Sequence, residues 1–540
     1  MMKHQKKSSY IASRPLLVLF ALIFVVSLLI LASCSYRLTS SKAWVRGFKV
    51  AFGGGSTEGT AKATVPKDRL LGGLLSPDFN EQSCLSRYQS MLHRKASPYI
   101  VSSHLTSKLR KYEELHKKCA PNTPLFKKSL QQLKKKQSMD QLECNYVLWS
   151  PVAGIGNRML TLVSAFLYAL LTNRVMLIHQ TADMVDLFCE PFPGSTWYLP
   201  SDFPINIYGY DVHSQNSYGF MVAHNLINSD HDSPPSALPP FMYLHIKYNY
   251  REQDLHTRFF CADDQEVISK INWILLKSDN YIVPGLFMVP KFEKELERMF
   301  PLKETVFHNL GRYLLHPSNS VWGMVMRYHK SYLAKAKEKI GIQARIFFWA
   351  PISIDELYKQ IVVCTQIKSI LPQLNPEQSE NSSMATDEAS PRAVLVTSLY
   401  GELYDRIRDM YYMHSTTTGE IISVYQPSHD ENQQFDQLVH NQKALAEIWL
   451  LSFSDVLITT SGSTFGYVSY SLASIKPFFL LSSKDQKFPH PPCRRSITLD
   501  PCFHSPPDFI CKTSNKTDSV KLARYLRHCE DYGEGIKLFD

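Results

Sequence analysis

The sequence predicts an α/β protein with two Rossmann-like domains that face a cleft. In two blocks of the chain, short runs rich in β-branched residues alternate with longer patterns of helical periodicity, which is typical of parallel sheets covered by helices. Mostly helical sequence separates the two blocks. The length of 540 residues also exceeds what one hydrophobic core usually supports. Sheets of this kind bind nucleotides in such a cleft, at the carboxyl ends of their strands.

The first block has the order strand, glycine-rich turn, helix, strand. We expect its strands at residues 144–149 and 174–179, its turn at 153–156 and its helix at 158–172. The second block has expected strands at residues 393–397, 421–425, 456–459 and 477–480, and expected helices at 401–413, 438–452 and 463–472. We also expect an amphipathic helical stretch over 105–136 and a polar surface loop over 375–391. The predicted domains are residues 81–335 and 336–540.

The N-terminus predicts a membrane anchor. Residues 16–33 are an unbroken apolar run that spans roughly 27 Å as a helix, which suits the thin bilayers of the early secretory pathway. We expect a tail (1–15), a transmembrane signal anchor (16–34) and a polar, glycine-containing stem (35–80). Because lysines and arginines flank the run on both sides, a lumenal body is predicted from the short tail and large body rather than from charge. A cleaved signal peptide and a lipoprotein signal ending at Cys34 are the alternatives.

Charge and cysteine content exclude some classes of function. The net charge is +10, and a basic stretch runs from Lys108 to Lys136, but no nucleic-acid-binding motif accompanies it. We interpret it as a solvated helical face and expect no nucleic-acid partner. None of the eleven cysteines forms a Cys-x-x-Cys pair, which argues against structural zinc. Four cysteines near the C-terminus predict disulfides in an oxidising compartment, and the odd total makes Cys34 the candidate free thiol.

A glycine-rich turn opens the helix of the first block. Its sequence is Gly154-Ile155-Gly156-Asn157-Arg158. Glycine permits close approach by a ligand, and a helix N-terminus attracts anions. The turn lacks the third glycine of a dinucleotide fingerprint and the Gly-Lys-Ser/Thr of a P-loop. A ligand-binding loop and simple tight packing therefore both explain it.

An arginine ends a short apolar strand in the second half. The segment Ile340-Gly341-Ile342-Gln343-Ala344-Arg345 is followed by an aromatic run. A guanidinium at the carboxyl end of a strand can donate paired hydrogen bonds to a diphosphate. A surface salt bridge is the alternative reading of Arg345.

A run of hydroxyl residues leads from a strand into a helix at Thr459–Gly466. The hydroxyls of Ser463 and Thr464, with the backbone N–H groups of a helix start, suit a β-phosphate. The same residues are favoured as ordinary helix N-caps, so this reading stays open.

One Asp-x-Asp pair occurs, at Asp230-His231-Asp232. Such a pair can bind a divalent metal. It lies in a polar, proline-rich stretch, and we interpret it as a chance match and expect no metal site.

Taken together, the motifs resemble those of the plant xyloglucan-type fucosyltransferases, the galactoside 2-α-L-fucosyltransferase family. The ordered matches are Leu70–Leu75, Cys84–Gln89, the long stretch from Gly154 to Leu177, Leu187–Trp197, Gly311–Leu314, His316-Pro317, Ile340–Arg345, Val424–His429, Ser463–Val468, Pro501–Pro507 and Arg527–Asp531. They cover nearly the whole body, from about residue 67 to the C-terminus.

The resemblance implies a GT-B-like fold with an acceptor-side N-terminal domain and a donor-binding C-terminal domain. It implies inverting transfer of fucose from GDP-β-L-fucose to a galactosyl 2-hydroxyl, without a metal or other cofactor. The residue matching the family's diphosphate-binding arginine is Arg345. The expected donor-binding residues are Arg345, Ser463, Thr464, Phe465, Gly466 and Tyr467, together with Gly154, Gly156, Asn157 and Arg158 of the first block.

An inverting displacement usually uses a general base, which accepts the proton of the acceptor hydroxyl. Asp279 and Asp531 lie in family-like motifs, and each can orient the acceptor, act as the base or support the fold. A loose, oxocarbenium-like transition state can also proceed without a strong base. With Arg345, these two carboxylates are the expected catalytic residues.

The resemblance also implies a type II Golgi membrane protein. Two glycosylation sequons, at Asn381 and Asn515, fit a lumenal body. The expected partners are GDP-fucose, a galactose-terminated glycan of cell-wall polysaccharide or proteoglycan, the Golgi membrane, and a second copy or another Golgi glycosyltransferase.

Several departures from the family pattern lie near the expected donor site. Gly462 stands where relatives commonly carry tryptophan, which predicts a reshaped donor pocket. Ala344 replaces a β-branched residue, and residues 346–349 differ from the usual continuation. The helix after Ser398–Tyr400 lacks the expected aromatic pair and glycine order. These changes keep open a second hypothesis, a non-catalytic family member that binds glycans or partners other Golgi enzymes.

Overall fold

The computed structural model describes residues 68–135, 142–227, 238–247, 255–375, 391–434, 436–507, 511 and 524–540. They belong to one compact unit, Lys67–Asp540. The predicted membrane anchor, both sequons, the Asp-x-Asp pair and nearly all of the loop expected at 375–391 lie outside the described residues. Part of the expected stem is described, and there Leu74 and Leu75 are buried in the body.

The first sheet has four strands and contains the first predicted block. The strands are β1 (Tyr146–Ser150), β2 (Val175–Ile178), β3 (Phe241–Ile246) and β4 (Trp273–Ser278). Their order is β2-β1-β4-β3, and every neighbouring pair is parallel. Nearly all of their side chains are buried, as expected for a parallel sheet covered on both faces. The carboxyl ends of β1 and β4 therefore lie side by side.

The second sheet has six strands in the order β10-β9-β8-β5-β6-β7. They are β5 (Glu338–Ala344), β6 (Arg392–Ser398), β7 (Ile422–Tyr425), β8 (Val456–Thr460), β9 (Phe478–Leu480) and β10 (Cys493–Arg495). All pairs are parallel except β9 and β10. Counted along the chain, this order is the one found in dinucleotide-binding sheets. The strand order reverses between β5 and β8, which is where such sheets bind ligands.

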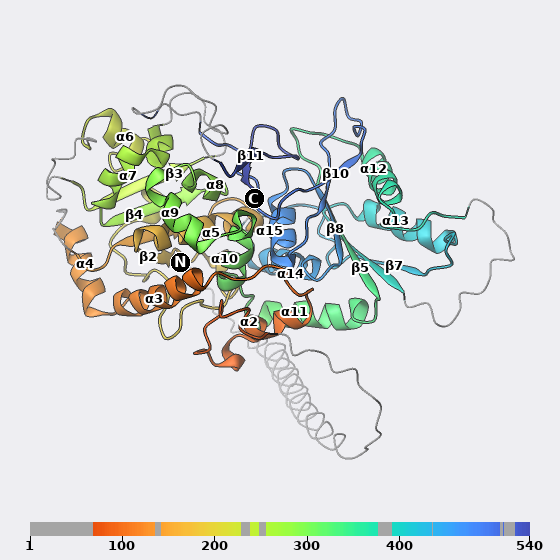
Figure 1. Cartoon of the computed structure of the whole chain (residues 1–540), viewed down its shortest axis with the longest axis horizontal. Coiled ribbons are helices and arrows are strands. Elements are labelled where there is room, and N and C mark those ends of the chain that lie inside the picture. Colours follow the sequence, from red (N-terminus) through yellow and green to blue (C-terminus); the bar gives the residue numbers. More distant parts are fainter. Residues whose placement is uncertain are drawn as a thin grey trace, which may run out of the picture. The chain divides into compact units, whose positions relative to one another are not determined.

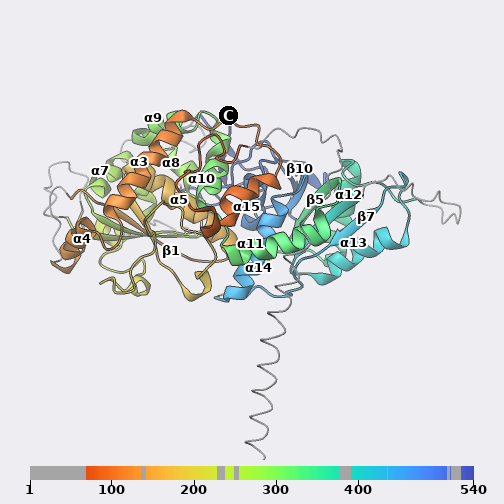
Figure 2. The ribbon, with the colours of Figure 1, turned by 90° about the horizontal axis from the view of Figure 1, so that it is seen from below.

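Helices join the two sheets into one body. Helices α5 (Ile155–Thr172), α10 (Val306–Leu314) and α15 (Thr464–Ala473) pack on one another between the sheets (Figure 1). Helix α11 (Asn319–Tyr328) runs beside α14 (Leu438–Leu451), as Figure 2 shows. Helix α5 is long and apolar enough to cross a membrane, but it is buried in the core. The other longer helices are α3 (Ser103–Cys119), α4 (Pro124–Lys135), α7 (Ala262–Ser269), α9 (Pro290–Met299), α12 (Ile354–Ile367) and α13 (Gly401–Met413).

Most predicted elements of the two blocks form within one to three residues of their expected bounds, and the helix at 401–413 agrees at both ends. The prediction of one helical stretch over 105–136 was wrong in one respect, because these residues form two helices. Helix α3 ends at Cys119 and α4 begins at Pro124. Between them Asn122 has a φ of +74°, and Pro121 and Pro124 disfavour a continuous helix.

Five disulfides cross-link the body. The pairs are Cys84–Cys189, Cys119–Cys144, Cys261–Cys511, Cys364–Cys493 and Cys502–Cys529. The prediction of disulfides is confirmed, although only one pair joins two of the four C-terminal cysteines. All ten cysteines after Cys34 are paired with one another, and Cys34 lies outside the described residues.

Candidate active site

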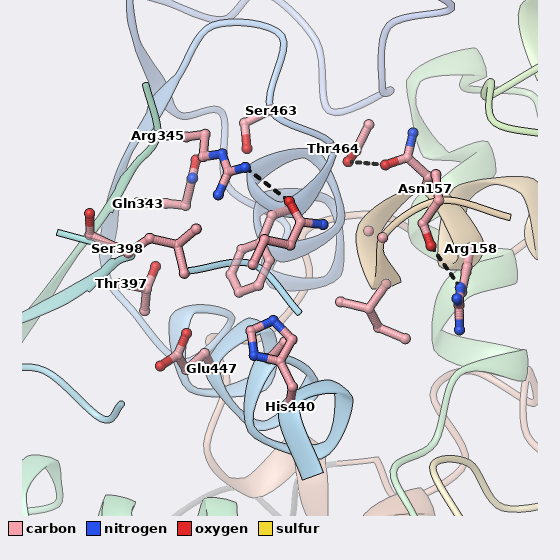
Figure 3. A pocket seen from close by; sticks show the side chains of 18 of the residues that line it. Asn157, Arg158, Gln343, Arg345, Thr397, Ser398, His440, Glu447, Ser463 and Thr464 are labelled. Atoms are coloured by element: carbon pink, nitrogen blue, oxygen red, sulfur yellow. Dashed lines mark hydrogen bonds between the residues drawn. The ribbon is translucent and has the colours of Figure 1, made fainter. Parts of the chain in front are cut away.

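A cavity of about 350 Å³ opens where the carboxyl ends of the parallel strands of both sheets meet (Figure 3). The first half of the body contributes Ala153, Gly154, Gly156, Asn157, Arg158 and Asp279 to its lining, and the second half contributes Arg345, Thr397, Ser398, Ser428, Gln433, Glu447, Ser463, Thr464 and Phe465 among others. The ligand-binding edges of two sheets therefore share one cavity, as the sequence predicted for a cleft.

Two helices begin side by side in the cavity wall. A Cβ atom added to Gly156, in the first turn of α5, would lie 2.8 Å from both the backbone nitrogen of Phe465 and the hydroxyl of Thr464. Only glycine fits at this approach of α5 to α15. Ser463 is the N-cap of α15, where its Oγ accepts from the Gly466 N–H at 3.5 Å. The partial positive charges of two helix N-termini thus point to one place, which favours an anion.

Asn157 connects the two halves of the cavity. Its Nδ2 donates to the carbonyl oxygen of Asp279 at 2.8 Å, and its Oδ1 accepts from the Thr464 hydroxyl at 3.0 Å. Asp279 is half-buried and lines the cavity, and its carboxylate accepts from the Asn280 side chain at 3.0 Å. The structure therefore brings Gly156, Asn157, Asp279 and Thr464 together, as their assignment to one site requires.

Arg345 presents its charge to the cavity. It follows β5 directly, and its backbone N–H donates to the Thr460 hydroxyl at 3.0 Å, across the point where the strand order reverses. Its guanidinium donates to the Gln433 side-chain oxygen at 2.9 Å, a neutral partner (Figure 3). Within the described part of the chain, no carboxylate forms an ion pair with Arg345. The side-chain contact of the Arg345 guanidinium is therefore this hydrogen bond to a neutral amide.

Arg158 differs from Arg345 because its charge is already paired. It forms a close ion pair with the buried Asp183 and lies 3.7 Å from the Asp436 carboxylate. Asp183 also accepts from the Asn441 side chain of α14 at 2.9 Å. This arrangement fastens the start of α5 to the second half of the body. Although Arg158 lines the cavity, the contacts give it a positioning role.

Three of the predicted site residues lie behind the cavity wall. Gly466 faces β8, where any side chain would collide with the Thr459 hydroxyl. Tyr467 is fully buried, and its hydroxyl donates to the Asp531 carboxylate at 2.6 Å. Asp531 also accepts the Gly462 N–H at 3.0 Å, and burial raises its pKa. These contacts hold the turn before α15, and Gly466, Tyr467 and Asp531 do not themselves line the cavity.

His504 and Glu447 line the cavity although the sequence did not single them out. His504 contacts the Tyr467 hydroxyl at 3.1 Å, and burial lowers its pKa to about 4, which keeps the ring neutral. Glu447 lies within α14 and accepts from the Ser428 hydroxyl at 2.5 Å. Burial raises the pKa of Glu447 to about 7. Glu447 could have been noticed in the sequence, because it is a carboxylate among the apolar residues of the expected helix 438–452.

Gly462 lies in the turn before α15. Its φ is +72°, in the region that favours glycine. The ring of Trp349 lies 3.4 Å from the point where a Cβ at residue 462 would stand. An aromatic ring therefore covers Gly462, and it comes from the turn after β5.

Comparisons with known proteins identify relatives along most of the chain. A family model described as xyloglucan fucosyltransferase matches residues 45–512. A galactoside 2-alpha-L-fucosyltransferase of Pisum sativum is 46% identical over 475 residues, which cover 88% of this chain and 82% of the relative. One of the same name from Arabidopsis thaliana is 46% identical over 476 residues, covering 88% and 84% of the two chains.

A solved structure has a similar fold. A mutant of Arabidopsis thaliana FUT1 in complex with GDP is 45% identical and superimposes with a TM-score of 0.80. The match covers 87% of this chain and 100% of that one.

Proposed function

Because the chain belongs to the xyloglucan fucosyltransferase family, we propose that it transfers L-fucose from GDP-fucose to the 2-hydroxyl of a terminal galactosyl residue on a glycan. The observation that supports this best is the cation of Arg345 beside the N-terminus of α15. A diphosphate in the cavity would meet a guanidinium that has no ion-pair partner among the described residues, together with the Ser463 and Thr464 hydroxyls.

The remainder of the cavity suits the nucleoside of such a donor. Figure 3 shows Ser398 and Glu447 away from the helix N-termini, and Ser428 also lines the cavity. The buried hydroxyl of Thr397 also lines it and has no hydrogen-bond partner within the described residues. Such a group is costly to leave unpaired, and a bound base or ribose can satisfy it. A nucleoside diphosphate therefore matches both the charged and the polar ends of the cavity.

In the proposed reaction, the acceptor 2-oxygen attacks C1 of fucose while the bond from C1 to the phosphate oxygen breaks. The β-linked donor becomes an α-linked product, so the configuration is inverted. Arg345 and the α15 N-terminus stabilise the negative charge that develops on the leaving GDP. Asp279, held by Asn157 at the cavity wall, is placed to accept the acceptor proton. The arginine takes the role that a divalent metal plays on other diphosphates, and we propose a metal-independent reaction.

Asp531 has a different role in this proposal. Its carboxylate binds the Tyr467 hydroxyl and the Gly462 N–H behind the cavity wall. It therefore positions the turn that leads to the phosphate-binding end of α15. We assign the proton to Asp279 and the positioning of the turn to Asp531.

The test is transfer by the full-length chain in detergent, with GDP-fucose and a panel of galactose-terminated acceptors. The expected product carries fucose on the galactosyl 2-oxygen, identified by linkage analysis. GDP binding is measured by calorimetry on the same sample. A chain that binds GDP but fucosylates no acceptor would instead be the non-catalytic family member, and a chain that does neither would contradict the proposed donor.

We further propose a single-pass type II protein of the Golgi, with the disulfide-linked body in the lumen. The apolar run at 16–33 and five disulfides in the described body support an oxidising, membrane-bounded compartment. Protease protection in sealed Golgi vesicles tests this orientation. A body digested without detergent would exclude it.

A further inference from the structure

An exposed aromatic turn follows the strand that carries Arg345. Residues 347–350 form a tight turn in which the Ala350 N–H donates to the Phe347 carbonyl at 3.1 Å. The side chain of Phe348, at its tip, is 94% exposed, and Trp349 is 40% exposed. The rings of Phe347 and Trp349 stack, with centroids 4.9 Å apart and planes inclined by 15°. Exposed apolar side chains that cluster in one patch, rather than lying singly, are typical of a binding surface.

The turn belongs to one end of the cavity. Phe347, Trp349 and Tyr532 line it, and the Trp349 ring stands edge-on to Tyr532 at 6.0 Å. Trp349 also covers Gly462, which immediately precedes the N-cap of α15. The aromatic cluster therefore adjoins the phosphate-binding end of the cavity. The polar end at Glu447, which we assign to the nucleoside, is formed by other elements.

The turn also reaches beyond the cavity. Phe347 and Trp349 line the space, whereas Phe348 is not part of the lining and faces solvent. A ligand that contacts both must extend outward from the point where the donor sugar meets its acceptor. An oligosaccharide acceptor has this shape.

We propose that the aromatic turn Phe347–Ala350 is an acceptor subsite that stacks against the apolar face of a pyranose ring in the glycan. This proposal rests on the proposed function of the same cavity. One face of a pyranose such as galactose presents C–H groups, which carry a small positive charge and pack well on the electron-rich face of an aromatic ring. The polar edge of the sugar stays hydrated or meets the hydrogen-bonding groups of the cavity.

The experiment compares Trp349→Ala and Phe348→Ser with Tyr412→Ala in the full-length chain. Tyr412 is a matched control because it is an aromatic residue of α13 that is 83% exposed and does not line the cavity. The KM for a galactose-terminated oligosaccharide is expected to rise about fivefold to tenfold in Trp349→Ala, in line with the strength of single aromatic contacts. The KM for GDP-fucose and the Kd of GDP should stay within about twofold of the wild type, and Trp349→Phe should recover most of the acceptor affinity.

Calorimetric binding of the oligosaccharide in the presence of GDP separates this proposal from the proposed function. Weaker glycan binding in Trp349→Ala and Phe348→Ser supports the subsite even if the wild type transfers no fucose. Unchanged glycan binding and unchanged acceptor KM in both variants would overturn it. So would variants that lose only GDP binding. Phe348→Ser guards against misfolding, because its side chain makes little contact with the body.

Discussion

The Oδ1 atom of Asn157, at the start of α5, accepts a 3.0 Å hydrogen bond from the hydroxyl of Thr464, at the start of α15. This bond joins the N-termini of two helices that follow strands of different sheets. The other end of the same amide holds the carbonyl of Asp279. A single side chain therefore sets the spacing between the proposed phosphate end and the proposed base.

We predict that Asn157→Ala weakens GDP binding and lowers kcat together. Each lost hydrogen bond contributes about 1 kcal/mol, so we expect kcat/KM to fall by at least roughly tenfold. The matched control is Asn319→Ala, which also removes two bonds between distant segments, to Leu85 and Gln82, but away from the cavity. Steady-state kinetics and GDP calorimetry distinguish the two, since Asn319→Ala should lower only the melting temperature. Equal effects of both variants on GDP affinity would contradict this role.

Arg345→Ala should lower kcat/KM by about 10²- to 10³-fold, the usual effect of removing a donor that stabilises developing charge. Arg345→Lys keeps the charge but loses the forked geometry, so it should recover only part of that loss. Arg327→Ala is the control, because Arg327 is an exposed arginine of α11 outside the lining. If Arg345→Ala binds GDP as tightly as the wild type does, the proposed donor site is contradicted.

Gly156→Ala should disrupt the contact between α5 and α15. The added Cβ would lie 2.8 Å from a backbone atom that cannot move aside without shifting α15. We expect a loss of about 1–3 kcal/mol in stability, typical of overpacking, with a drop in GDP affinity. Gly401→Ala meets nothing within 4 Å and should leave both properties unchanged. Thermal unfolding and calorimetry measure them, and a fully active Gly156→Ala would show that the spacing is not needed.

Glu447 should make stability depend on pH. Burial raises its folded-state pKa from 4.5 to about 7, so the folded protein holds this proton more tightly than the unfolded chain does. Its ionisation therefore costs stability progressively as pH rises from about 4.5 to 7, by at most about 3 kcal/mol. The melting temperature of Glu447→Gln should exceed that of the wild type by a margin that grows as pH rises through this window. At higher pH the difference in melting temperature should stay constant. The exposed Glu534→Gln is the control, and a melting difference that does not vary with pH would refute the prediction.

Chelation should leave transfer intact. If Arg345 and the α15 N-terminus neutralise the leaving diphosphate, EDTA should change the initial rate by less than about twofold. Adding Mg²⁺ or Mn²⁺ afterwards should have equally little effect. Loss of activity on chelation with recovery on adding the ion would show that the arginine is insufficient.

The sequence by itself determined the elements and the family. Hydrophobic periodicity is a local property, and it predicted the βαβ blocks and the helix at 401–413 because each element buries one face or both. The break between α3 and α4 was missed, although its prolines were visible. The ordered motifs likewise predicted several cavity residues, among them Gly154 and Thr464. The placement of these residues depends on short turns that follow strands.

Only the tertiary structure decided which of these residues face the ligand. Arg158 and Arg345 look equivalent as arginines after a turn and a strand, yet a buried carboxylate pairs with the first and a neutral amide with the second. Tyr467 and Asp531 lie in motifs but pack behind the wall. The sequence also could not predict the five disulfide pairs or the contact of the Trp349 ring with Gly462. Four of these six contacts join segments that lie more than a hundred residues apart in the chain. Local pattern sets what each segment becomes, whereas charge pairing and cavity shape arise only when distant segments meet.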